Sequence, residues 1–447
     1  MPVLAHKIRL FPTEEQAVSF ERAAGVARFT YNWALAECNR VRAETGKNPK
    51  MADLKKKFNG LKGEQFPWIY DSPKDANQQP FTNLQKAWKR FWYGVKKEGK
   101  IPVWSRAQKK KLLAEGVKPS KMSFAPTFKR KKDGASFYVS NDKFSLFGKM
   151  VKLPVVGVVQ MAECLRFEGK VMSGTVSKYG GHWFLSVQVE VQDRDYFRFR
   201  SDDGIAGIDL GVKDTAIIVN GIQTEKATGP KPLKKALRRL AIRQRRVSRK
   251  RQAQLEKMGL KGKAIPKGTK IPKSNNQLKA ESAVTRIHAR VKNVRSDFQH
   301  KLTNRLCSEN QAIAIEDLSI AGMMQNKKLS RAIADIGMGE IRRQIQYKAL
   351  RYGTQIVLVD RWYPSSKTCS GCGWKKEDLK LSDREWVCEG CGTIHDRDEN
   401  AGINLRNKVF EVFPDLLPAG SPESHARADM TGGCSSQAGN FDLLRNG

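Results

Sequence analysis

Cys369-Ser-Gly-Cys372 and Cys388-Glu-Gly-Cys391 are two Cys-x-x-Cys pairs separated by fifteen residues in the last quarter of the chain. Pairs at this spacing are typical of a zinc site with four thiolate ligands. The alternatives are four reduced cysteines that fall in pairs by chance, and a redox dithiol, but redox motifs come singly and this one is duplicated. Four thiolates leave zinc no open coordination position, so we expect a zinc ion that stabilises the fold and takes no part in catalysis.

Three acids stand where predicted strands end and a helix begins. Asp209 and Glu316 each end an apolar stretch that predicts a buried strand, and Asp398 lies just before the helix expected over residues 400–412. Two divalent cations that clamp the attacking water and the leaving oxygen need such a cluster of oxygen ligands. Acids this far apart in sequence can converge only by folding, and an RNase H-like sheet brings them together in this arrangement. These three acids are therefore the candidate catalytic and magnesium-binding residues.

The choice of the third acid rests on helix geometry. Asp396 and Asp398 both precede the closing helix. We favour Asp398, because a helix N-terminus can orient its carboxylate, and we expect Asp396 to support it from alongside. Asp214 and Asp317 are expected to serve turns or caps.

The charge of the chain predicts its partner. It carries 82 basic against 45 acidic residues, a formal net charge of +37. Such an excess favours nucleic acid, because phosphate contacts release counterions. A membrane surface is the other polyanion, but no apolar run approaches the ~20 residues that cross a bilayer. Scattered cysteines (Cys38, Cys164, Cys307, Cys434) and a first segment without a signal-peptide core favour a reducing cytoplasm.

The N-terminal half predicts a small β-barrel with a helical insert. Residues 3–10 alternate as a strand, and Thr13-Glu-Glu-Gln16 is a capping box that begins a helix. Strand patterns return between residues 135 and 191, where Tyr179-Gly-Gly-His182 predicts a hairpin turn. We therefore expect the helices of residues 13–125 to be inserted between the first strand and the rest of the barrel.

A strongly basic helix is expected next. Residues 226–255 contain no acid and are crowded with arginine and lysine, with a leucine stripe at helical spacing. A solvated charged helix is one interpretation, but thirty residues with no balancing acid favour contact with nucleic acid. The candidate contacts are Lys234, Lys235, Arg238, Arg239, Arg243, Arg245, Arg246, Arg249, Lys250 and Arg251.

Together these motifs resemble the TnpB family, transposon-encoded RNA-guided nucleases related to the compact type V CRISPR effectors. The resemblance rests on Gly207-Ile-Asp209-Leu-Gly211, Ile315-Glu316-Asp317-Leu318, the two Cys-x-x-Cys pairs, His395-Asp-Arg-Asp398-Glu-Asn-Ala-Gly-Ile-Asn404 and the opening Lys7-Ile-Arg-Leu-Phe-Pro-Thr13. It covers nearly the whole chain to about Leu416. Glu399 and Gly402 stand where Val and Ala are common in the family, and neither change removes a ligand.

The resemblance implies an α+β multidomain chain. Residues 1–12 and 126–195 would form a wedge β-barrel with a helical recognition insert at 13–125. Residues 204–362 and 395–415 would form a RuvC nuclease domain of RNase H-like α/β fold, with an inserted four-Cys zinc ribbon at 363–394 that binds target nucleic acid. Residues 416–447, which lack periodicity, are expected to be disordered.

The resemblance also implies RNA-guided cleavage of DNA. A transposon-derived non-coding RNA would supply the guide, a short motif beside the target would be checked by the protein, and hydrolysis would use two metal ions. Asp209, Glu316 and Asp398 would hold Mg²⁺, and the four cysteines would hold Zn²⁺. The partners would be guide RNA and target DNA, with no membrane. The protein would act as a monomer or as a homodimer on the RNA, in a bacterial cytoplasm and at the nucleoid when bound to DNA.

Three alternatives stay open. A miniature type V CRISPR effector would differ by its genomic neighbourhood, a repeat array in place of transposon ends. A non-catalytic zinc-ribbon RNA-binding protein would use the acids structurally. A cut-and-paste transposase also uses three acids on an RNase H-like fold. The zinc element between the last two acids, and the lack of a recognisable N-terminal helix-turn-helix, argue against the transposase.

Overall fold

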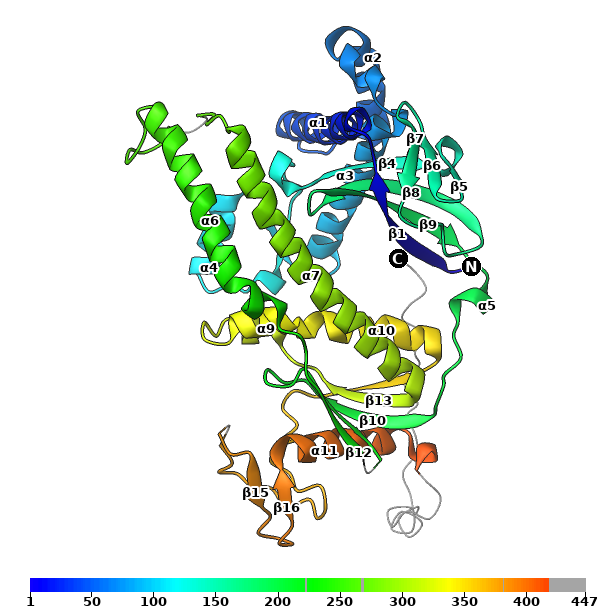
Figure 1. Cartoon of the computed structure of the whole chain (residues 1–447), viewed down its shortest axis with the longest axis vertical. Helices are drawn as coiled ribbons and strands as arrows, with labels where there is room; N and C mark the ends of the chain where they lie inside the picture. The colour runs from blue at the N-terminus through cyan, green and yellow to red at the C-terminus, as the bar shows by residue number, and fades with distance from the viewer. Residues whose placement is uncertain (222, 267–268, 381, 418–447) are drawn as a thin grey trace. The chain divides into compact units, whose positions relative to one another are not determined.

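The computed structural model describes residues 1–417 except 222, 267–268 and 381. It shows a mixed α/β fold with two compact units (Figure 1). Unit 1 comprises Met1–Tyr196 and Leu240–Ala289, and unit 2 comprises Phe197–Arg239 and the chain from Arg290 onward. Within the described ranges, no helix is long and apolar enough to cross a membrane. From residue 418 on, the tail expected to be disordered lies outside the described residues.

Unit 1 is built on a seven-stranded sheet in the order β4-β8-β9-β1-β7-β6-β5, with every neighbouring pair antiparallel. Its strands are β1 (Val3–Phe11), β4 (Ala135–Ser140), β5 (Ser145–Phe147), β6 (Met150–Leu153), β7 (Gly157–Met161), β8 (Lys170–Tyr179) and β9 (His182–Glu190). Gly180 and Gly181, at φ 62° and 86°, form the predicted turn between β8 and β9, because both positions need a positive φ. The pairings among described residues leave β4 and β5 at the edges, so closure into a barrel stays a prediction.

The segment between β1 and β4 is mainly helical, as the sequence predicts. It contains α1 (Glu14–Thr45), α2 (Met51–Gln65), η1 (Pro67–Asp71), α3 (Lys74–Lys96), β2 (Ile101–Val103), α4 (Arg106–Ala114), η2 (Pro119–Lys121), β3 (Met122–Phe124) and η3 (Lys131–Asp133). The predicted capping box is confirmed, since Thr13 and Gln16 exchange hydrogen bonds between side chain and backbone. Phe20 of α1 contacts Trp183 of β9 with ring centroids 5.1 Å apart, so the helices and the sheet share one core. The short elements η4 (Asn141–Lys143) and α5 (Asp193–Tyr196) complete this part of the chain.

Unit 2 is built on a five-stranded sheet in the order β12-β11-β10-β13-β14. Its strands are β10 (Gly204–Asp209), β11 (Ala216–Asn220), β12 (Gln223–Ala227), β13 (Asn310–Glu316) and β14 (Gln355–Val359). β10, β13 and β14 run parallel to one another, and β11 is antiparallel to β10 and to β12. Edge strand β12 departs from the sequence interpretation, which placed Lys226 in the basic segment. The basic helix α6 (Pro232–Lys257) begins only after Gly229 and Pro230, residues that disfavour a helix interior.

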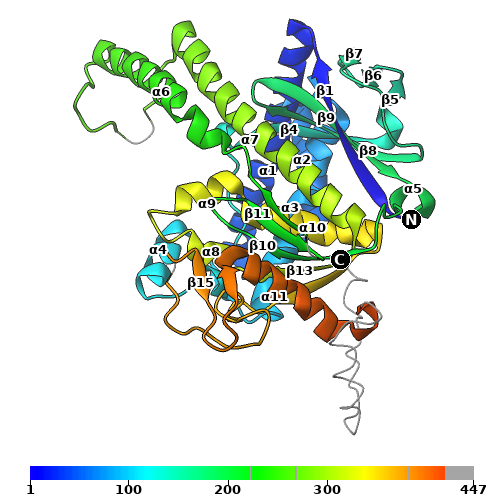
Figure 2. The same ribbon diagram turned by 60° about the horizontal axis from the view of Figure 1, so that its bottom comes forward.

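Helices cover both faces of the unit 2 sheet (Figures 1 and 2). These helices are α7 (Asn275–Glu309), α8 (Ile320–Met323), α9 (Ser330–Ile336), α10 (Met338–Tyr352) and α11 (Arg397–Val412), followed by η5 (Pro414–Leu416). Ile313 and Ile315 of β13 pack with α7, α9 and α10, whereas Ala312 and Ala314 pack with α11. Alternate side chains of a strand point to opposite faces, so a strand buried on both faces reads as the continuous apolar run seen in the sequence.

A small hairpin lies between β14 and α11. Its strands β15 (Glu385–Val387) and β16 (Ile394–Asp396) pair antiparallel, with Trp386 opposite His395. Trp386, Leu379, Cys369 and Cys388 form a separate small core there. α11 starts directly after β16, at Arg397, so the predicted closing helix begins three residues earlier than expected.

Candidate functional site

Asp209 and Glu316 lie at the same edge of the unit 2 sheet. Asp209 is the last residue of β10, Glu316 is the last residue of β13, and the two strands pair in parallel with Ile208 opposite Ile315. Parallel neighbours end at a common edge, where sites in α/β sheets form. Both acids are half-buried. Strand pairing thus brings two of the three candidate acids side by side.

Asp398 reaches this edge from α11. It lies in the first turn of the helix, and Oδ1 of Asp396 accepts hydrogen bonds from the backbone N of Asp398 (2.9 Å) and of Glu399 (3.0 Å). Asp396 is therefore the N-cap of α11, a supporting role next to Asp398.

Two glycines let α11 lie directly on the sheet. A Cβ at Gly207 of β10 would stand only 2.0 Å from the carbonyl oxygen of Gly402, and a Cβ at Gly402 would stand 2.4 Å from Cγ2 of Val219. Gly402 of α11 therefore lies directly against the side chain of Val219 of β11, where a Cβ would not fit. Close contact between helix and strand fixes where Asp398 lies relative to Asp209.

The negative charges of Glu316 and Asp398 act on Asp209. Burial, followed by the negative charges of Glu316 and Asp398, raises the pKa of Asp209 to about 7. Burial also raises the pKa of Glu316, and a hydrogen bond from Ser365 opposes that change. Carboxylates gathered in a poorly solvated place favour a bound cation, and their oxygens are the ligands that Mg²⁺ prefers. The donor set therefore fits Mg²⁺.

Two arginines contact the carboxylate of Asp398. Its carboxylate accepts hydrogen bonds from Arg384 (3.0 Å) and Arg397 (3.1 Å). In the described part of the chain, only the four paired cysteines form a group of three or more ligand residues with atoms within 4.8 Å of one another. The three acids are thus less closely grouped than the four cysteines.

The four paired cysteines form a compact thiolate group. The Sγ atoms of Cys369, Cys372, Cys388 and Cys391 all lie within 4.8 Å of one another. Cys372 and Cys388 are 3.5 Å apart, and Cys369 and Cys391 are 3.6 Å apart. Tetrahedral zinc with Zn–S bonds of ~2.3 Å places its sulfurs ~3.8 Å apart, so the four thiolates fit zinc.

The backbone of each knuckle turns at a glycine. Gly373 N donates to Cys369 O (2.9 Å) and Gly392 N donates to Cys388 O (2.8 Å), at φ 79° and 75°. Only glycine adopts this left-handed conformation without strain. Buried His395 lies with Nε2 3.0 Å from Cys369 Sγ, within hydrogen-bond distance of a thiolate ligand.

A loop links the acids to the zinc site. Ser365 Oγ donates a 2.7 Å hydrogen bond to Oε1 of Glu316. The backbone oxygen of the same serine accepts a 2.7 Å hydrogen bond from Asn404 Nδ2, which also donates to Thr368 O at 2.7 Å. Asn404 is buried on α11, the helix that carries Asp398. One short loop therefore contacts both Glu316 and the helix of Asp398.

Asn400 holds the other end of this loop. Its Nδ2 donates to Thr368 O (2.7 Å), and its Oδ1 accepts from Ser370 N (2.9 Å). These residues flank Cys369, a candidate zinc ligand. Sequence reasoning did not single out Ser365, Asn400 or Asn404. Two asparagines inside a helix were the available indication, because asparagine is unfavourable there without a specific partner.

Other nearby acids have separate partners. Asp214 accepts a hydrogen bond from Thr228 Oγ1 at 2.5 Å, and its turn or cap role stays a prediction. Asp317 was predicted to serve a turn or cap, but it forms ion pairs with Arg342 and with Arg361, the latter at 2.6 Å. Its proximity in sequence to Glu316 therefore does not bring it into the acid cluster.

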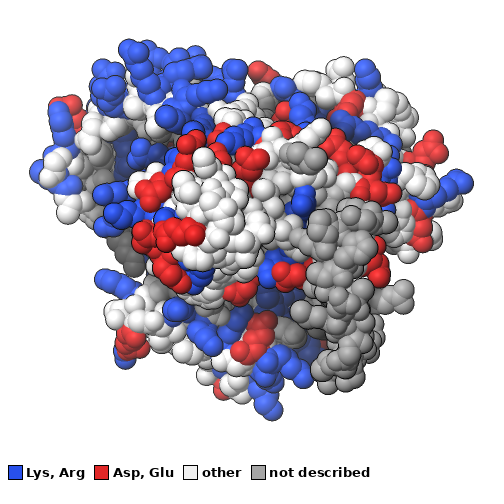
Figure 3. Space-filling model, turned by 90° about the horizontal axis from the view of Figure 1, so that it is seen from below, with Lys and Arg blue, Asp and Glu red and all other residues white. Residues whose placement is uncertain are grey.

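The basic helix presents its charges to solvent. Nine of the ten candidate contact residues on α6 are exposed, and Lys250 is half-buried. Among the described residues, no acid forms an ion pair with any of the ten. Figure 3 shows a dense group of Lys and Arg at the upper left of one face of the molecule. Contact between α6 and nucleic acid stays a prediction.

Three family models match parts of the sequence. Residues 339–405 match a model described as "Cas12f1-like, TNB domain", residues 266–327 match "Probable transposase", and residues 1–47 match "Helix-turn-helix domain". The last match corrects the expectation that no helix-turn-helix would be recognised. Over those residues, however, the structure has one strand, β1, and a single helix, α1.

Full-length relatives define the family. A Streptomyces pristinaespiralis protein named "Putative RNA-guided DNA endonuclease" is 32% identical over 90% of this chain and 88% of its own length. A Mycobacterium tuberculosis protein of the same description is 29% identical over 96% of this chain and 91% of its own. This chain therefore belongs to the TnpB family. The protein in the cryo-EM structure of a Cas12f1–sgRNA–target DNA complex is 15% identical over 91% of this chain and 99% of that chain, with a TM-score of 0.32.

Proposed function

We propose that this protein is an RNA-guided DNA endonuclease that hydrolyses target DNA at Asp209, Glu316 and Asp398. The proposal rests mainly on the meeting of Asp209 and Glu316 at one sheet edge. The negative charge of Asp398 contributes to the raised pKa of Asp209. Burial and mutual repulsion disfavour the ionised form of clustered carboxylates, and a bound divalent cation removes this free-energy cost. The names of the full-length relatives support the same activity.

The architecture proposed from the sequence is compatible with this activity. An antiparallel trio followed by parallel strands, β12-β11-β10-β13-β14, supports an RNase H-like RuvC domain at residues 204–362 and 395–415. The hairpin with four cysteines supports a zinc ribbon at 363–394 that binds target nucleic acid. The unit 1 sheet supports a wedge domain at 1–12 and 126–195, with the recognition insert at 13–125.

Each acid has a distinct task in the proposed site. Mg²⁺ bound there would stabilise charge on the scissile phosphate and lower the pKa of the attacking water. Asp209 and Glu316 would hold the cations from the sheet edge, and Ser365 orients the carboxylate of Glu316. Asp398 would complete the site from α11, where its carboxylate contacts Arg384 and Arg397. Zinc bound by the four cysteines would be structural, because four thiolates are a complete ligand set.

Nucleic-acid recognition is divided between base pairing and charge. A guide RNA would read the target sequence by pairing, while the protein holds the heteroduplex through phosphates and checks a short flanking motif. The ten basic residues of α6 are proposed to lie along the guide or the heteroduplex, because almost all are exposed and none forms an ion pair with an acid among the described residues.

The experiment begins with RNA that co-purifies with the expressed protein. Sequencing this RNA identifies the guide, and a plasmid library with the matching target and randomised flanks then supplies the substrate. We expect Mg²⁺-dependent cutting of a subset of flanks, no cutting by Asp209→Ala, and unchanged target binding by that variant. A zinc-ribbon RNA-binding protein would retain RNA and never cut. Normal cutting by Asp209→Ala would reject the site assignment.

A further inference from the structure

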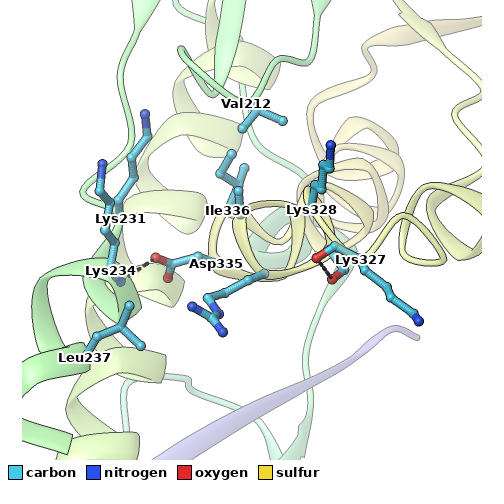
Figure 4. A pocket seen from close by; sticks show the side chains of 11 residues that line it. Val212, Lys231, Lys234, Leu237, Lys327, Lys328, Asp335 and Ile336 are labelled. Carbon is cyan, nitrogen blue, oxygen red and sulfur yellow. Dashed lines mark hydrogen bonds between the residues drawn. The ribbon is translucent and has the colours of Figure 1, made fainter. Parts of the chain in front are cut away.

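Unit 2 contains a pocket lined by cations close to the acid edge (Figure 4). Its volume is about 520 Å³, within the range of small-molecule and cofactor sites. Part of its wall is apolar, formed by Val212, Leu237 and Ile336. Its cationic residues are Lys231, Lys234, Lys327, Lys328 and Arg331.

The acid in the pocket wall, Asp335, is already occupied. It is buried, with 4% of its surface exposed. Its two carboxylate oxygens accept hydrogen bonds from the backbone N of Leu233 and of Lys234, both at 2.9 Å, at the start of α6. Arg295 donates to it at 3.3 Å. Asp335 thus binds a helix end and Arg295, and among the described residues it forms no ion pair with a cation of the pocket.

The cations themselves lack acidic partners. Lys234, Lys327, Lys328 and Arg331 are exposed, and within the described chain none of them forms an ion pair with an acid. Lys231 is fixed differently: its Nζ donates to Lys213 O at 2.6 Å, and its backbone has φ 44°. A non-glycine residue in this conformation is strained, and such strain is often found at functional positions. Several like charges around one concavity favour an anionic occupant.

The pocket is placed to hold a strand that approaches the acids. Val212 follows Asp209 in the loop after β10, and Lys327 lies in the segment after β13, which ends at Glu316. The carboxyl ends of these parallel strands share one edge. The segments that contribute Val212 and Lys327 to the pocket therefore leave the sheet at the edge where the candidate acids Asp209 and Glu316 lie.

We propose that this pocket binds one nucleotide of the single-stranded DNA that is delivered to the acids. Lys327, Lys328 and Arg331 contact its backbone phosphate, and the apolar wall receives the sugar or base. The inference rests on the proposed nuclease function and adds the place where the strand is held. We assign DNA and not the guide RNA, because the strand to be cut must pass the edge that carries Asp209 and Glu316.

Photocrosslinking tests this assignment by position. Arg331→p-benzoylphenylalanine protein, purified with its RNA, is irradiated with end-labelled matching DNA, and wild-type cutting of the same DNA is measured in parallel. We expect a crosslink to a DNA strand. If the wild type cuts and the crosslink forms with RNA, or with neither nucleic acid, the pocket assignment is overturned while the nuclease function stands. If the wild type does not cut, both are overturned.

A matched pair of variants provides the second test. Lys327→Ala/Lys328→Ala/Arg331→Ala removes three pocket charges, and Lys149→Ala/Lys152→Ala/Arg194→Ala removes two lysines and one arginine from exposed positions of unit 1. With DNA fully bound, we expect the pocket variant to cut about tenfold more slowly, because positioning is lost, and the control variant to cut within about twofold of wild type. Equal slowing in both variants would mean an effect of bulk charge and would reject the pocket. Thermal midpoints within about 2 °C of wild type exclude unfolding as the cause.

Discussion

Ser365 Oγ donates a 2.7 Å hydrogen bond to Oε1 of Glu316, and its backbone oxygen accepts one from Asn404 of α11. The same serine thus contacts a candidate catalytic carboxylate and the helix that carries Asp398. It lies four residues before Cys369, so the zinc loop and the acid edge share a physical connection. Glu316 also depends on this contact electrostatically, because the hydrogen bond opposes the rise in its pKa that burial causes.

Removing the serine hydroxyl should therefore slow cutting without loss of RNA. We expect Ser365→Ala to lower the single-turnover cutting rate about tenfold, since Glu316 loses its orientation and part of its ionised population. Ser370→Ala is the matched control, because Ser370 contributes its backbone N, and not its hydroxyl, to Asn400. A rate for Ser365→Ala equal to that of the control would show that this hydrogen bond does not position Glu316.

The metal-free protein should lose stability as pH rises. The pKa of Asp209 is raised from 3.8 to about 7, so between these values the folded protein keeps a proton that the unfolded chain has released. The free energy of unfolding therefore falls as pH increases through this window and levels off above pH 7. In Asp209→Asn the fall should be smaller, and at about pH 8 this variant should melt about 3 °C or more above wild type.

Added Mg²⁺ distinguishes the cause of this pH dependence. At about pH 8, saturating Mg²⁺ should raise the thermal midpoint of wild type, because the cation neutralises the acids, and should have little effect on Asp209→Asn. Differential scanning calorimetry at several pH values measures both effects. Parallel curves for the two proteins at every pH, with and without Mg²⁺, would contradict the acid cluster.

The zinc site should be stoichiometric and structural. We expect about one zinc per chain by elemental analysis, with more than about half lost in Cys388→Ser, because the tetrahedral set is then incomplete. Cutting should fall with zinc content, since Asn400 and Asn404 anchor the loop of Cys369 to α11. Cys164→Ser, at an exposed cysteine outside the group, should keep both zinc and activity. Full zinc content in Cys388→Ser would remove that residue from the ligand set.

The contact between α11 and β10 leaves no room for a methyl group. A Cβ at Gly207 would lie 2.0 Å from Gly402 O and 2.5 Å from Arg406 N, both backbone atoms, so α11 would have to move. We expect Gly207→Ala to lower the free energy of unfolding by about 2 kcal/mol or more and to abolish cutting. Gly25→Ala in α1 is the control, since nothing lies within 4 Å of its Cβ position and alanine favours a helix. Unchanged stability of Gly207→Ala would show that the helix can shift freely.

Local features were predictable from the sequence. Thr13 and Gln16 form their capping box, and Gly180 and Gly181 form their hairpin turn, because both depend on residues next to one another in the chain. The cysteine spacing predicted a compact thiolate group, because two Cys-x-x-Cys pairs at this separation are typical of a zinc site. The positions of Asp209 and Glu316 at strand ends could be predicted, because a strand buried on both faces is an uninterrupted apolar run and each acid ends such a run.

Features that depend on distant partners were not predictable. Asp317 was already expected to lie outside the catalytic set, but its partners Arg342 and Arg361, which only the fold brings near, could not be predicted. Strand β12 is polar and forms because it pairs with β11, so nothing in its sequence indicated that a strand continues to Ala227. The role of Ser365 depends on Glu316, which lies in another strand, and no periodicity in the sequence indicates such a pair.

The central claim is that Asp209, Glu316 and Asp398 hold divalent cations in one site. Fe²⁺ can replace Mg²⁺ at oxygen ligands, and with ascorbate and peroxide it cuts the polypeptide within reach of the bound ion. We predict cuts near all three residues, suppressed by excess Mg²⁺ and absent in Asp209→Asn. Cuts near only one of the three, or cuts that excess Mg²⁺ leaves unchanged, would contradict a shared metal site.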